Sequence, residues 1–242
     1  MKFGKSIVTD GLIYYMDVAN KRCYPGSGLD FTELIAKTST LSGGLSGLKN
    51  GTAFSTENKG TFVLDGVNDY IRILDDAKFS FGDASNDSPF SLEFWANMDA
   101  DGNFRFVSKE NEWRLNCVTS GVLRLSLYDS NTSNYIGLES DSVLAAYEGQ
   151  WINLVATYDG GGSHTGCTIY VNGSILPTSA KNAGSYTAMH NKTSNVWLGR
   201  FRDGGFNAYA NGKIAIFKMY NKELTASELL QNYNALKARY NL

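Results

Sequence analysis

A group of polar side chains interrupts an apolar stretch of the sequence, residues 62–73, which reads FVLDGVNDYIRI. Asp65, Asn68 and Asp69 lie within this stretch, close to the end of one predicted strand and the start of the next. Neighbouring carboxylates can catalyse glycoside hydrolysis or bind calcium, and Asp and Asn also form tight turns through side-chain to backbone hydrogen bonds. These alternatives predict an enzyme, a metal-dependent lectin, or a protein that acts through its surface.

Retaining glycoside hydrolysis needs two carboxyl groups about 5–5.5 Å apart, a spacing that acids two positions apart on one strand provide. The segment FSLEFWANM offers Glu93 alone, because Trp95 and Asn97 occupy the next two positions on the same face. Other acidic pairs with this spacing fall in predicted turns or at a strand end: Asp99/Asp101, Glu110/Glu112 and Glu139/Asp141. The spacing of the acids therefore disfavours a hydrolase.

The sequence contains no motif typical of other classes of enzyme. The two histidines, His164 and His190, both lie in polar segments typical of exposed loops. The sequence has no H-E-x-x-H, no P-loop, no G-x-G-x-x-G, and no G-x-S-x-G at a strand-to-helix turn. We predict that the protein is not an enzyme.

Calcium is the one cofactor that the sequence keeps open, because oxygen ligands are abundant in its loops. A site would require the loops that carry its ligands to converge, and the candidate ligands are Asp17, Asp65, Asn68 and Asp69. The alternative is that the last three residues form a tight turn without a metal.

Glycan binding is the remaining hypothesis for a site. Lectin sites combine exposed aromatic rings with Asp, Asn and Arg side chains on loops. Segment 199–212, GRFRDGGFNAYANG, has this composition, and a strand-end pair formed by Tyr158 and Asp159 is similar. The candidate residues are Arg200, Asp203, Phe206, Asn207, Tyr209 and Tyr158. The alternative for each ring is a packed aromatic residue beside a turn.

The elements that must position these residues are mostly strands. Between residues 60 and 220, short segments alternate apolar and polar side chains with period two, as Phe90, Leu92 and Phe94 illustrate. The chain has 25 Gly and only 3 Pro, and Asn172-Gly173 is a two-residue hairpin signal. The pattern predicts an all-β fold made of a two-sheet antiparallel sandwich.

Two regions depart from this pattern. Residues 20–60 are rich in Gly, Ser and Thr, and we expect long loops that cover the sandwich through apolar anchors at Leu29, Phe31, Leu34 and Ile35. Residues 226–239 predict one C-terminal helix, which would dock through an apolar stripe at helical spacing. The stripe consists of Leu229, Tyr233, Leu236 and Tyr240. A T-x-x-E capping box, Thr225 and Glu228, precedes this stripe. No linker or repeat appears, so we expect residues 1–242 to form one domain.

Charge and apolar runs bear on partners and location. The formal net charge is −2 and basic residues are scattered, so the sequence does not predict a nucleic-acid binder. No apolar run is long enough to span a membrane, and the N-terminus does not read as a signal peptide, which favours synthesis in a cytoplasm. Cys23, Cys117 and Cys167 form no C-x-x-C, and we expect buried thiols; the alternative is a disulfide between Cys117 and Cys167.

Taken in order, these segments resemble the laminin-G-like branch of the concanavalin A-like lectin/glucanase superfamily. The resemblance rests on FVLDGVNDYIRI, FSLEFWANM, WINLVATYDG, IYVNG, VWLGRF and GKIAIFKMYNKELTASELLQNYNALKARY. It implies a two-sheet jelly roll. The segments 8–34 and 228–242 are similar to a subgroup common among structural proteins of tailed phages. At the position of Ala215 the family often has an acid that contributes to a structural calcium site.

The resemblance implies a non-catalytic accessory role in a virion, as a capsid decoration, neck or tail component. Partners would be the major capsid or tail proteins and further copies of the chain. The protein would be made in the host cytoplasm and assembled onto the particle. The rival hypothesis is a carbohydrate-binding module for adsorption to glycans, and a glycoside hydrolase is the least favoured alternative.

Overall fold

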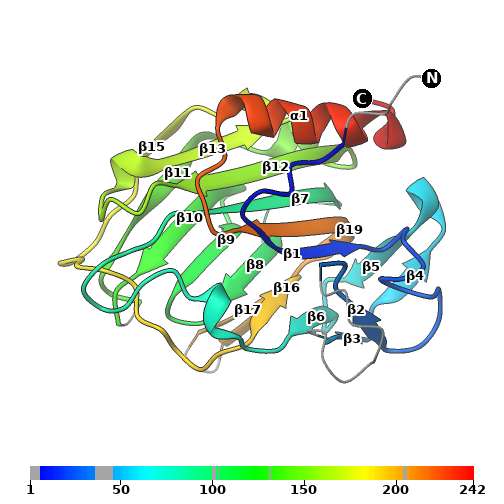
Figure 1. Cartoon of the computed structure of the whole chain (residues 1–242), viewed down its shortest axis with the longest axis horizontal. Helices are drawn as coiled ribbons and strands as arrows, with labels where there is room; N and C mark the ends of the chain where they lie inside the picture. Colours follow the sequence, from blue (N-terminus) through cyan, green and yellow to red (C-terminus); the bar gives the residue numbers. More distant parts are fainter. Residues whose placement is uncertain (1–5, 36–45, 100–101, 103, 131, 204–205) are drawn as a thin grey trace.

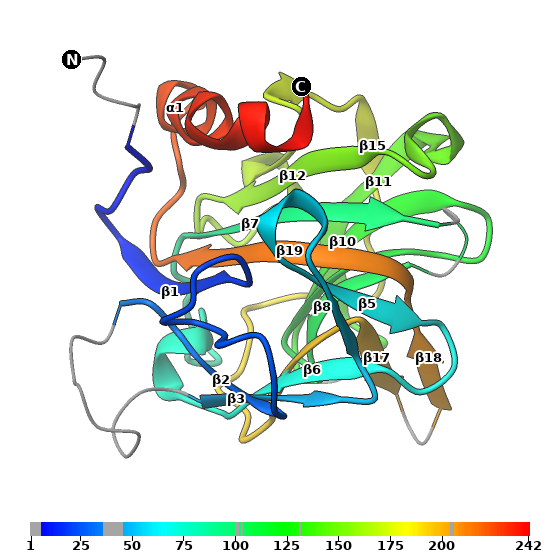
Figure 2. The ribbon, with the colours of Figure 1, turned by 90° about the vertical axis from the view of Figure 1, so that its right-hand side faces the viewer.

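The structure is a computed structural model of the chain, and it describes residues 6–35, 46–99, 102, 104–130, 132–203 and 206–242 (Figure 1). For residues 46–49, 202–203 and 206–207 the description covers the backbone only. Two antiparallel sheets face each other, and one α-helix lies on the outer side of the first sheet (Figures 1 and 2). The predicted all-β jelly-roll sandwich with a C-terminal helix is therefore confirmed.

The first sheet has eight strands, in the order β14-β13-β12-β7-β19-β5-β4, with β1 also paired to β19. Its strands are β1 (Leu12–Asp17), β4 (Ala53–Ser55), β5 (Thr61–Asp65), β7 (Phe90–Met98), β12 (Trp151–Tyr158), β13 (Cys167–Val171), β14 (Ser174–Ile175) and β19 (Asn211–Tyr220). The long strands β7, β12 and β19 form its centre.

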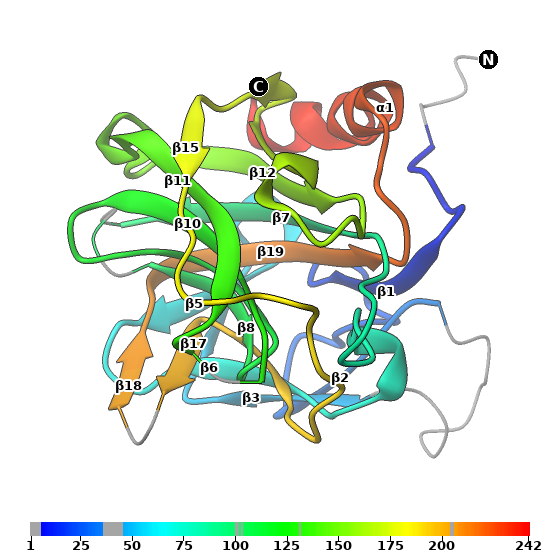
Figure 3. The ribbon, with the colours of Figure 1, turned by 90° about the vertical axis from the view of Figure 1, so that its left-hand side faces the viewer.

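The second sheet has nine strands, in the order β15-β11-β10-β9-β8-β16-β6-β3-β2. Its strands are β2 (Asp30–Thr32), β3 (Ser46–Asn50), β6 (Tyr70–Ile73), β8 (Arg105–Lys109), β9 (Trp113–Cys117), β10 (Val122–Tyr128), β11 (Tyr135–Val143), β15 (Thr178–Ala180) and β16 (Val196–Leu198). A separate hairpin, β17 (Arg200–Asp203) and β18 (Phe206–Tyr209), lies on the side of the molecule opposite the helix (Figure 3). The remaining elements are short 3₁₀ turns at 57–59, 77–79, 145–147, 164–166 and 237–240.

The core lies between the two sheets and follows the predicted alternation. Phe90, Leu92 and Phe94 of β7 all point inward and are fully buried. Phe94 stacks on Phe217 of β19 with ring centroids 4.6 Å apart. The three cysteines are buried and form no disulfide, as expected.

The hairpin between β13 and β14 also confirms its prediction. Val171 pairs with Ser174, and the two residues between them, Asn172 and Gly173, have φ angles of 52° and 79°. A type I′ turn requires positive φ at both central positions, which Asn and Gly adopt at low cost.

Residues 20–60 contain more regular structure than we expected. Where the composition predicted loops, β2 and β3 form one edge of the nine-stranded sheet, and β4 forms one edge of the eight-stranded sheet. Strands of three to five residues rich in Gly, Ser and Thr have too little alternation to be recognised. Of the expected anchors, Phe31 is buried and Leu34 packs on the core, but Leu29 is exposed.

The helix α1 (Ala226–Leu236) begins at the predicted capping box. Thr225 Oγ1 accepts a hydrogen bond from the Glu228 amide, and the Glu228 carboxylate accepts one from the Thr225 amide. The helix ends three residues earlier than expected and continues as the 3₁₀ turn Lys237–Tyr240. Its apolar stripe docks as predicted, with Trp95 of β7 stacked on Tyr240 at a centroid distance of 4.3 Å.

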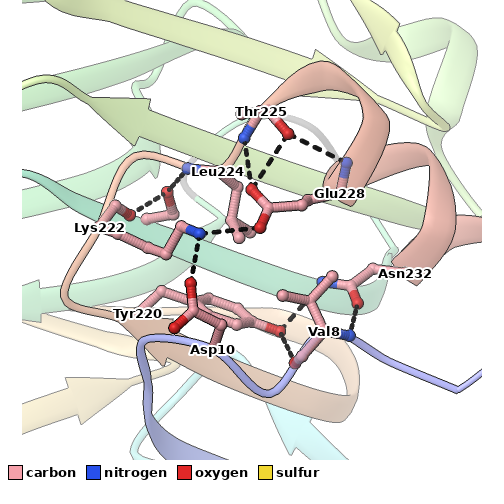
Figure 4. A network of polar contacts seen from close by, with 9 residues as sticks. Val8, Asp10, Tyr220, Lys222, Leu224, Thr225, Glu228 and Asn232 are labelled. Atoms are coloured by element: carbon pink, nitrogen blue, oxygen red, sulfur yellow. Dashed lines mark hydrogen bonds and ion pairs between the residues drawn. The ribbon is translucent and has the colours of Figure 1, made fainter.

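A buried ion pair lies between α1 and the sheet. Glu93 of β7 and Lys218 of β19 are both completely buried, with Oε1 and Nζ 2.9 Å apart. Asn232 of α1 donates to the other Glu93 oxygen at 2.7 Å and to the Tyr220 hydroxyl at 3.0 Å. Its own oxygen accepts from the backbone N–H of Val8 at 2.7 Å (Figure 4). One side chain thus joins the helix, the sheet and the N-terminal segment.

Lys222 adds a second connection between the same segments. Its ammonium lies 2.7 Å from a carboxylate oxygen of Asp10 and 2.8 Å from one of Glu228, so it bridges the N-terminal segment and the first turn of α1 (Figure 4).

None of the helices in the described part of the chain is long and apolar enough to cross a membrane.

We expect Glu93→Gln to lower the free energy of unfolding by about 3–5 kcal/mol, because it leaves the Lys218 ammonium buried without its counter-charge. Denaturant unfolding measures the change. The double variant Glu93→Gln/Lys218→Met should recover most of the loss, since a neutral pair of similar size leaves no buried charge without its counter-charge.

The control is Lys213→Gln, which removes one partner of the partly exposed Lys213–Glu57 pair and should cost no more than about 1 kcal/mol. A loss of similar size in Glu93→Gln would show that the buried pair has no special role.

Candidate functional site

The acidic turn is held together by hydrogen bonds from its backbone amides to its own carboxylates. Oδ1 of Asp65 accepts hydrogen bonds from the backbone N–H groups of Val67, Asn68 and Asp69 at 2.8, 3.2 and 3.3 Å. Oδ2 of Asp69 accepts from the Asp65 amide at 3.1 Å. The hydrogen bonds to Asp65, that of the Val67 amide first, lower the pKa of its carboxyl. The turn carries the chain from β5 in one sheet to β6 in the other.

The four candidate calcium ligands do not come together. Asp17 pairs with Ile216 of β19 and Asp65 pairs with Asn211, so the two lie about 17 Å apart along β19. The Asp17 carboxylate is 2.8 Å from Nη1 of Arg239. Within the described residues, no group of three or more His, Cys, Asp or Glu side chains has a metal-binding arrangement.

Glu93, the one acid on the strand that a glucanase would use, lies beneath α1. Both of its oxygens are engaged, one by Lys218 and Asn153 and the other by Asn232. Ala215, where a family acid was considered, is fully buried in the cluster that contains Trp95. Neither position can present a carboxylate to a substrate.

The outer side of the nine-stranded sheet has a different character. Outward residues of β6, β8, β9, β10 and β16 are mostly arginine and aromatic, and residues of the β17–β18 hairpin lie against them. We call this surface the arginine–aromatic face, and it comprises Tyr70, Arg72, Arg105, Arg114, Tyr128, Trp197, Arg200, Phe201 and Tyr209.

Arg200 is at the centre of one half of the face. Its guanidinium carbon lies 4.6 Å from the ring centroid of Trp197, 4.9 Å from that of Tyr70 and 5.8 Å from that of Tyr209. Tyr70 and Trp197 also contact each other edge to face at 5.2 Å. All four side chains are partly exposed. A guanidinium over an aromatic ring is a cation–π contact, which orients the planar group.

The backbone places Arg200 through a bend at Gly199. Gly199 has a φ of 75°, and a Cβ there would approach Leu64 side-chain atoms to 2.9 Å, so the position favours glycine. The bend ends β16 and directs the next residues into β17. Ser108 of β8 then donates to the Arg200 carbonyl at 3.0 Å and ties the hairpin to the sheet.

Phe201 organises the other half of the face. Its ring centroid lies 4.7 Å from the guanidinium carbon of Arg114 and 5.1 Å from that of Arg105. Arg114 also lies 4.9 Å from the ring of Tyr128. Burial, together with the positive charge of Arg114, lowers the pKa of Arg105 to about 10. The sheet therefore brings guanidinium groups close together at some electrostatic cost.

The sequence identified part of this face. Arg200 and Tyr209, two candidates from segment 199–212, lie close together in the structure. The side chains of Asp203, Phe206 and Asn207 lie outside the described residues. Tyr158 was wrongly included as a surface ring, because it is fully buried and its hydroxyl donates to Asp87 at 2.7 Å. Burial and this contact raise the pKa of the Tyr158 hydroxyl.

Sequence reasoning missed Tyr70, Trp197 and Phe201. The alternation in YIRI and VWL contained a signal, since the outward positions there are Tyr70, Arg72 and Trp197, while their neighbours are buried. Contact between β6 and β16 could not be inferred, because they are about 125 residues apart in the chain and pair only in the folded sheet.

Comparisons with known proteins place the chain by family and fold. The family model described as the concanavalin A-like lectin/glucanases superfamily matches residues 65–230. No curated protein sequence matches the chain.

Solved structures with similar folds share little sequence with the chain. Domain 4 of AbnA, an extracellular arabinanase from Geobacillus stearothermophilus solved with arabinotriose, has a TM-score of 0.63 and 15% identity over 92% of this chain and 98% of its own. The binding domain of Paraclostridial Mosquitocidal Protein 1 has a TM-score of 0.65 and 15% identity over 93% of this chain and 52% of its own. Trypanosoma rangeli sialidase, solved with sialic acid, has a TM-score of 0.64 and 13% identity over 97% of this chain and 34% of its own. The chain thus spans about half of the mosquitocidal domain and a third of the sialidase.

The turn geometry predicts a pH-dependent effect of Asp65→Asn. Because the folded-state pKa of Asp65 is below its ordinary value of 3.8, the ionised carboxylate stabilises the fold above that value, and this contribution is lost as the pH falls through the folded pKa. At about pH 7 we expect the variant to be less stable by about 1 kcal/mol, since a neutral amide accepts weaker hydrogen bonds.

Thermal unfolding followed from about pH 7 down to about pH 3 checks this, and the difference between the two proteins should shrink towards zero. Calcium should change neither melting temperature. A calcium-dependent rise in the wild type that Asp65→Asn abolishes would contradict the metal-independent turn.

Proposed function

The chain belongs to the concanavalin A-like lectin/glucanases superfamily, and from that premise we propose that it is a non-catalytic domain that binds glycans through the arginine–aromatic face. One observation carries the proposal: the Arg200 guanidinium is held against the rings of Trp197, Tyr70 and Tyr209 at a partly exposed surface. Aromatic rings offer flat apolar area to the C–H faces of sugars, and an oriented guanidinium offers hydrogen-bond donors to their oxygens.

The opposite side of the sandwich supports the non-catalytic part of the proposal. Glu93 is enclosed by α1 and is held in a complete set of contacts with Lys218, Asn153 and Asn232. A general acid must reach the substrate oxygen directly or through one water molecule, and Glu93 in this position does not.

Two similar folds were solved with arabinotriose and with sialic acid, which supports a sugar as the ligand class. The arginine–aromatic face supplies groups suited to binding a sugar.

The biological setting that we propose is the surface of a phage particle, where the domain is an accessory component of the capsid, neck or tail. The segments that resemble tailed-phage structural proteins, 8–34 and 228–242, lie together in the fold: Val8 binds Asn232, and Asp17 pairs with Arg239. This unit covers the eight-stranded sheet and leaves the arginine–aromatic face on the other side for ligands. Capsid or tail proteins and further copies of the chain are the partners that fit this role.

A glycan array tests the binding function, with Trp197→Ala as the informative variant. We expect the wild type to bind a subset of glycans and the variant to lose on the order of tenfold in affinity, because a stacked ring contributes about 1–1.5 kcal/mol. Trp197→Phe should retain most of the binding.

The matched control is Leu230→Ala, which truncates an exposed apolar side chain on α1 and should bind like the wild type. If the wild type binds no glycan at high protein concentration, the proposed function is wrong.

Mass spectrometry of purified particles tests the setting. Peptides of this chain should copurify with the major capsid or tail proteins at a fixed ratio. Particles that lack the polypeptide would contradict the virion role and leave the binding function to be judged by the array alone.

A further inference from the structure

The N-terminal segment, residues 6–11, is held against α1 as a bound peptide would be (Figure 4). It forms neither a helix nor a strand, and at Val8 both backbone groups bind side chains. The Val8 N–H donates to Oδ1 of Asn232 at 2.7 Å, and the Val8 carbonyl accepts from the Tyr220 hydroxyl at 3.2 Å. Asn232 and Tyr220 are almost completely buried. Two buried side chains thus recognise the backbone of one residue.

An apolar cluster receives the side chain of the same residue. Val8 is buried and packs in a cluster with Val155, Tyr220, Leu224 and Leu229. These four residues come from β12, β19, α1 and the connection before the helix, so the folded sandwich itself builds the cluster. An apolar side chain at this position is stabilised by its removal from water.

Polar contacts hold the segment on both sides of Val8. Nε2 of Gln231 donates to the Ser6 carbonyl at 2.9 Å. The Lys222 ammonium lies 2.7 Å from a carboxylate oxygen of Asp10. Polar pairs at the surface contribute little energy, so these contacts mainly fix the direction of the segment. The residues around α1 therefore form a site for a segment in which an acid follows an apolar residue by two positions.

A turn joins this segment to β1. The Leu12 amide donates to the Thr9 carbonyl at 3.2 Å. The Asn221 amide donates to the Gly11 carbonyl at 2.9 Å, which anchors the turn to the end of the sheet. Gly11 has a φ of 70°, a conformation that glycine adopts at low cost. Because β1 pairs with β19 only from Leu12 onward, rotation at Gly11 can release residues 6–10 without breaking the sheet.

The site is unfavourable to leave empty. Without the segment, Oδ1 of Asn232 and the Tyr220 hydroxyl lose their partners, and the apolar cluster is opened to water. Each of these changes raises the free energy of the chain, so the filled site is the stable one. A segment from a second copy supplies the same groups as the chain's own segment. The two states therefore differ mainly in the effective concentration of the segment at the site.

From these observations we infer that the site on α1 also binds the N-terminal segment of a neighbouring copy, so that copies of the chain exchange residues 6–10. Residues 6–11 span at most about 20 Å when extended, so the two copies are direct neighbours. The inference gives a docking site to further copies of the chain, which are among the partners proposed above. It does not rest on glycan binding, because the arginine–aromatic face lies on the other side of the sandwich.

The experiment traps a segment of one full-length chain on a second chain. One chain carries Ser6→Cys and the other carries Gln231→Cys, two exposed positions that contact each other in the structure. The two proteins are mixed at high concentration and treated with a short thiol-reactive cross-linker, which does not reach the three native cysteines because they are buried. In dilute solution the double variant Ser6→Cys/Gln231→Cys should cross-link within one chain, which sets the yield of a docked segment.

The control pair combines Ser6→Cys with Ala238→Cys, an exposed position on the turn that follows α1. We expect the Ser6→Cys and Gln231→Cys chains to form a covalent heterodimer in at least fivefold higher yield than the control pair.

Variants at Val8 separate docking from collision. Val8→Ser in the Ser6→Cys chain should lower the heterodimer yield at least fivefold, because a polar side chain does not replace the apolar contact. The same change in the Gln231→Cys chain should raise the yield at least twofold, since that chain's own segment then competes less for the site. The matched control is Thr9→Ala, an exposed position in the same segment, which should alter the yield less than twofold. Circular dichroism melts confirm that each variant is folded.

The outcomes separate this inference from the proposed function. A heterodimer yield no higher than that of the control pair would overturn the inference and show that each chain keeps its own segment. A high yield that Val8→Ser leaves unchanged in either chain would also overturn it, because the cross-link would then report a collision at the surface. Neither result bears on the glycan array or on the mass spectrometry of particles, which judge the proposed function separately.

Discussion

The buried contact between Glu93, Lys218 and Asn232 determines which side of the sandwich is covered. Two charges without solvent contact are stable only when their remaining hydrogen-bonding capacity is used, and here the amide of Asn232 and that of Asn153 complete the set around Glu93. Because Asn232 belongs to α1 and its oxygen also accepts from the Val8 amide, the full set of hydrogen bonds forms only when the helix and the N-terminal segment are both in place. The aromatic contacts of Trp95 with Tyr233 and Tyr240 then add apolar burial to the same interface.

This constraint has a consequence for function. A sandwich of two sheets has two outer faces, and in this chain one of them is closed by α1 and its charge network. The other sheet presents arginine side chains packed against aromatic rings, and these cation–π contacts help to fix the orientation of the guanidinium groups. Side chains that are already held in one orientation lose less entropy when a ligand binds, so such a surface is suited to ligand recognition. Glu93, the acid considered for hydrolysis, is on the side that α1 covers, and the arginine–aromatic face is on the other side.

Particular residues show what the sequence could predict. Period-two alternation was sufficient to predict the sandwich and the inward residues Phe90, Leu92 and Phe94, because burial on one face of a strand leaves a local pattern. The capping box and the apolar stripe of α1 were predicted for the same reason.

The sequence left two alternatives for the acidic turn, since Asp65 and Asn68 are common both in tight turns and in metal sites. The hydrogen bonds from the backbone amides to Asp65 are a feature of the fold that the sequence does not reveal. The sequence identified the arginine–aromatic face only in part: Arg200 and Tyr209 belong to one segment, but Tyr70, Arg114 and Trp197 come near them through pairings between distant strands. Tyr158 was wrongly predicted to be at the surface. The sequence around a tyrosine at a strand end is the same whether its hydroxyl contacts solvent or a buried partner such as Asp87.

The most direct test of the account is a backbone-amide NMR titration of the isotope-labelled protein with an oligosaccharide that the glycan array identifies, since it reports the binding face without any substitution. The account predicts that the largest shift changes cluster on β6, β16 and the start of β17, at residues 70–73 and 196–201, with little change in α1. Changes confined to α1 and the N-terminal segment, or to the loops at 159–166 and 183–190, would contradict it.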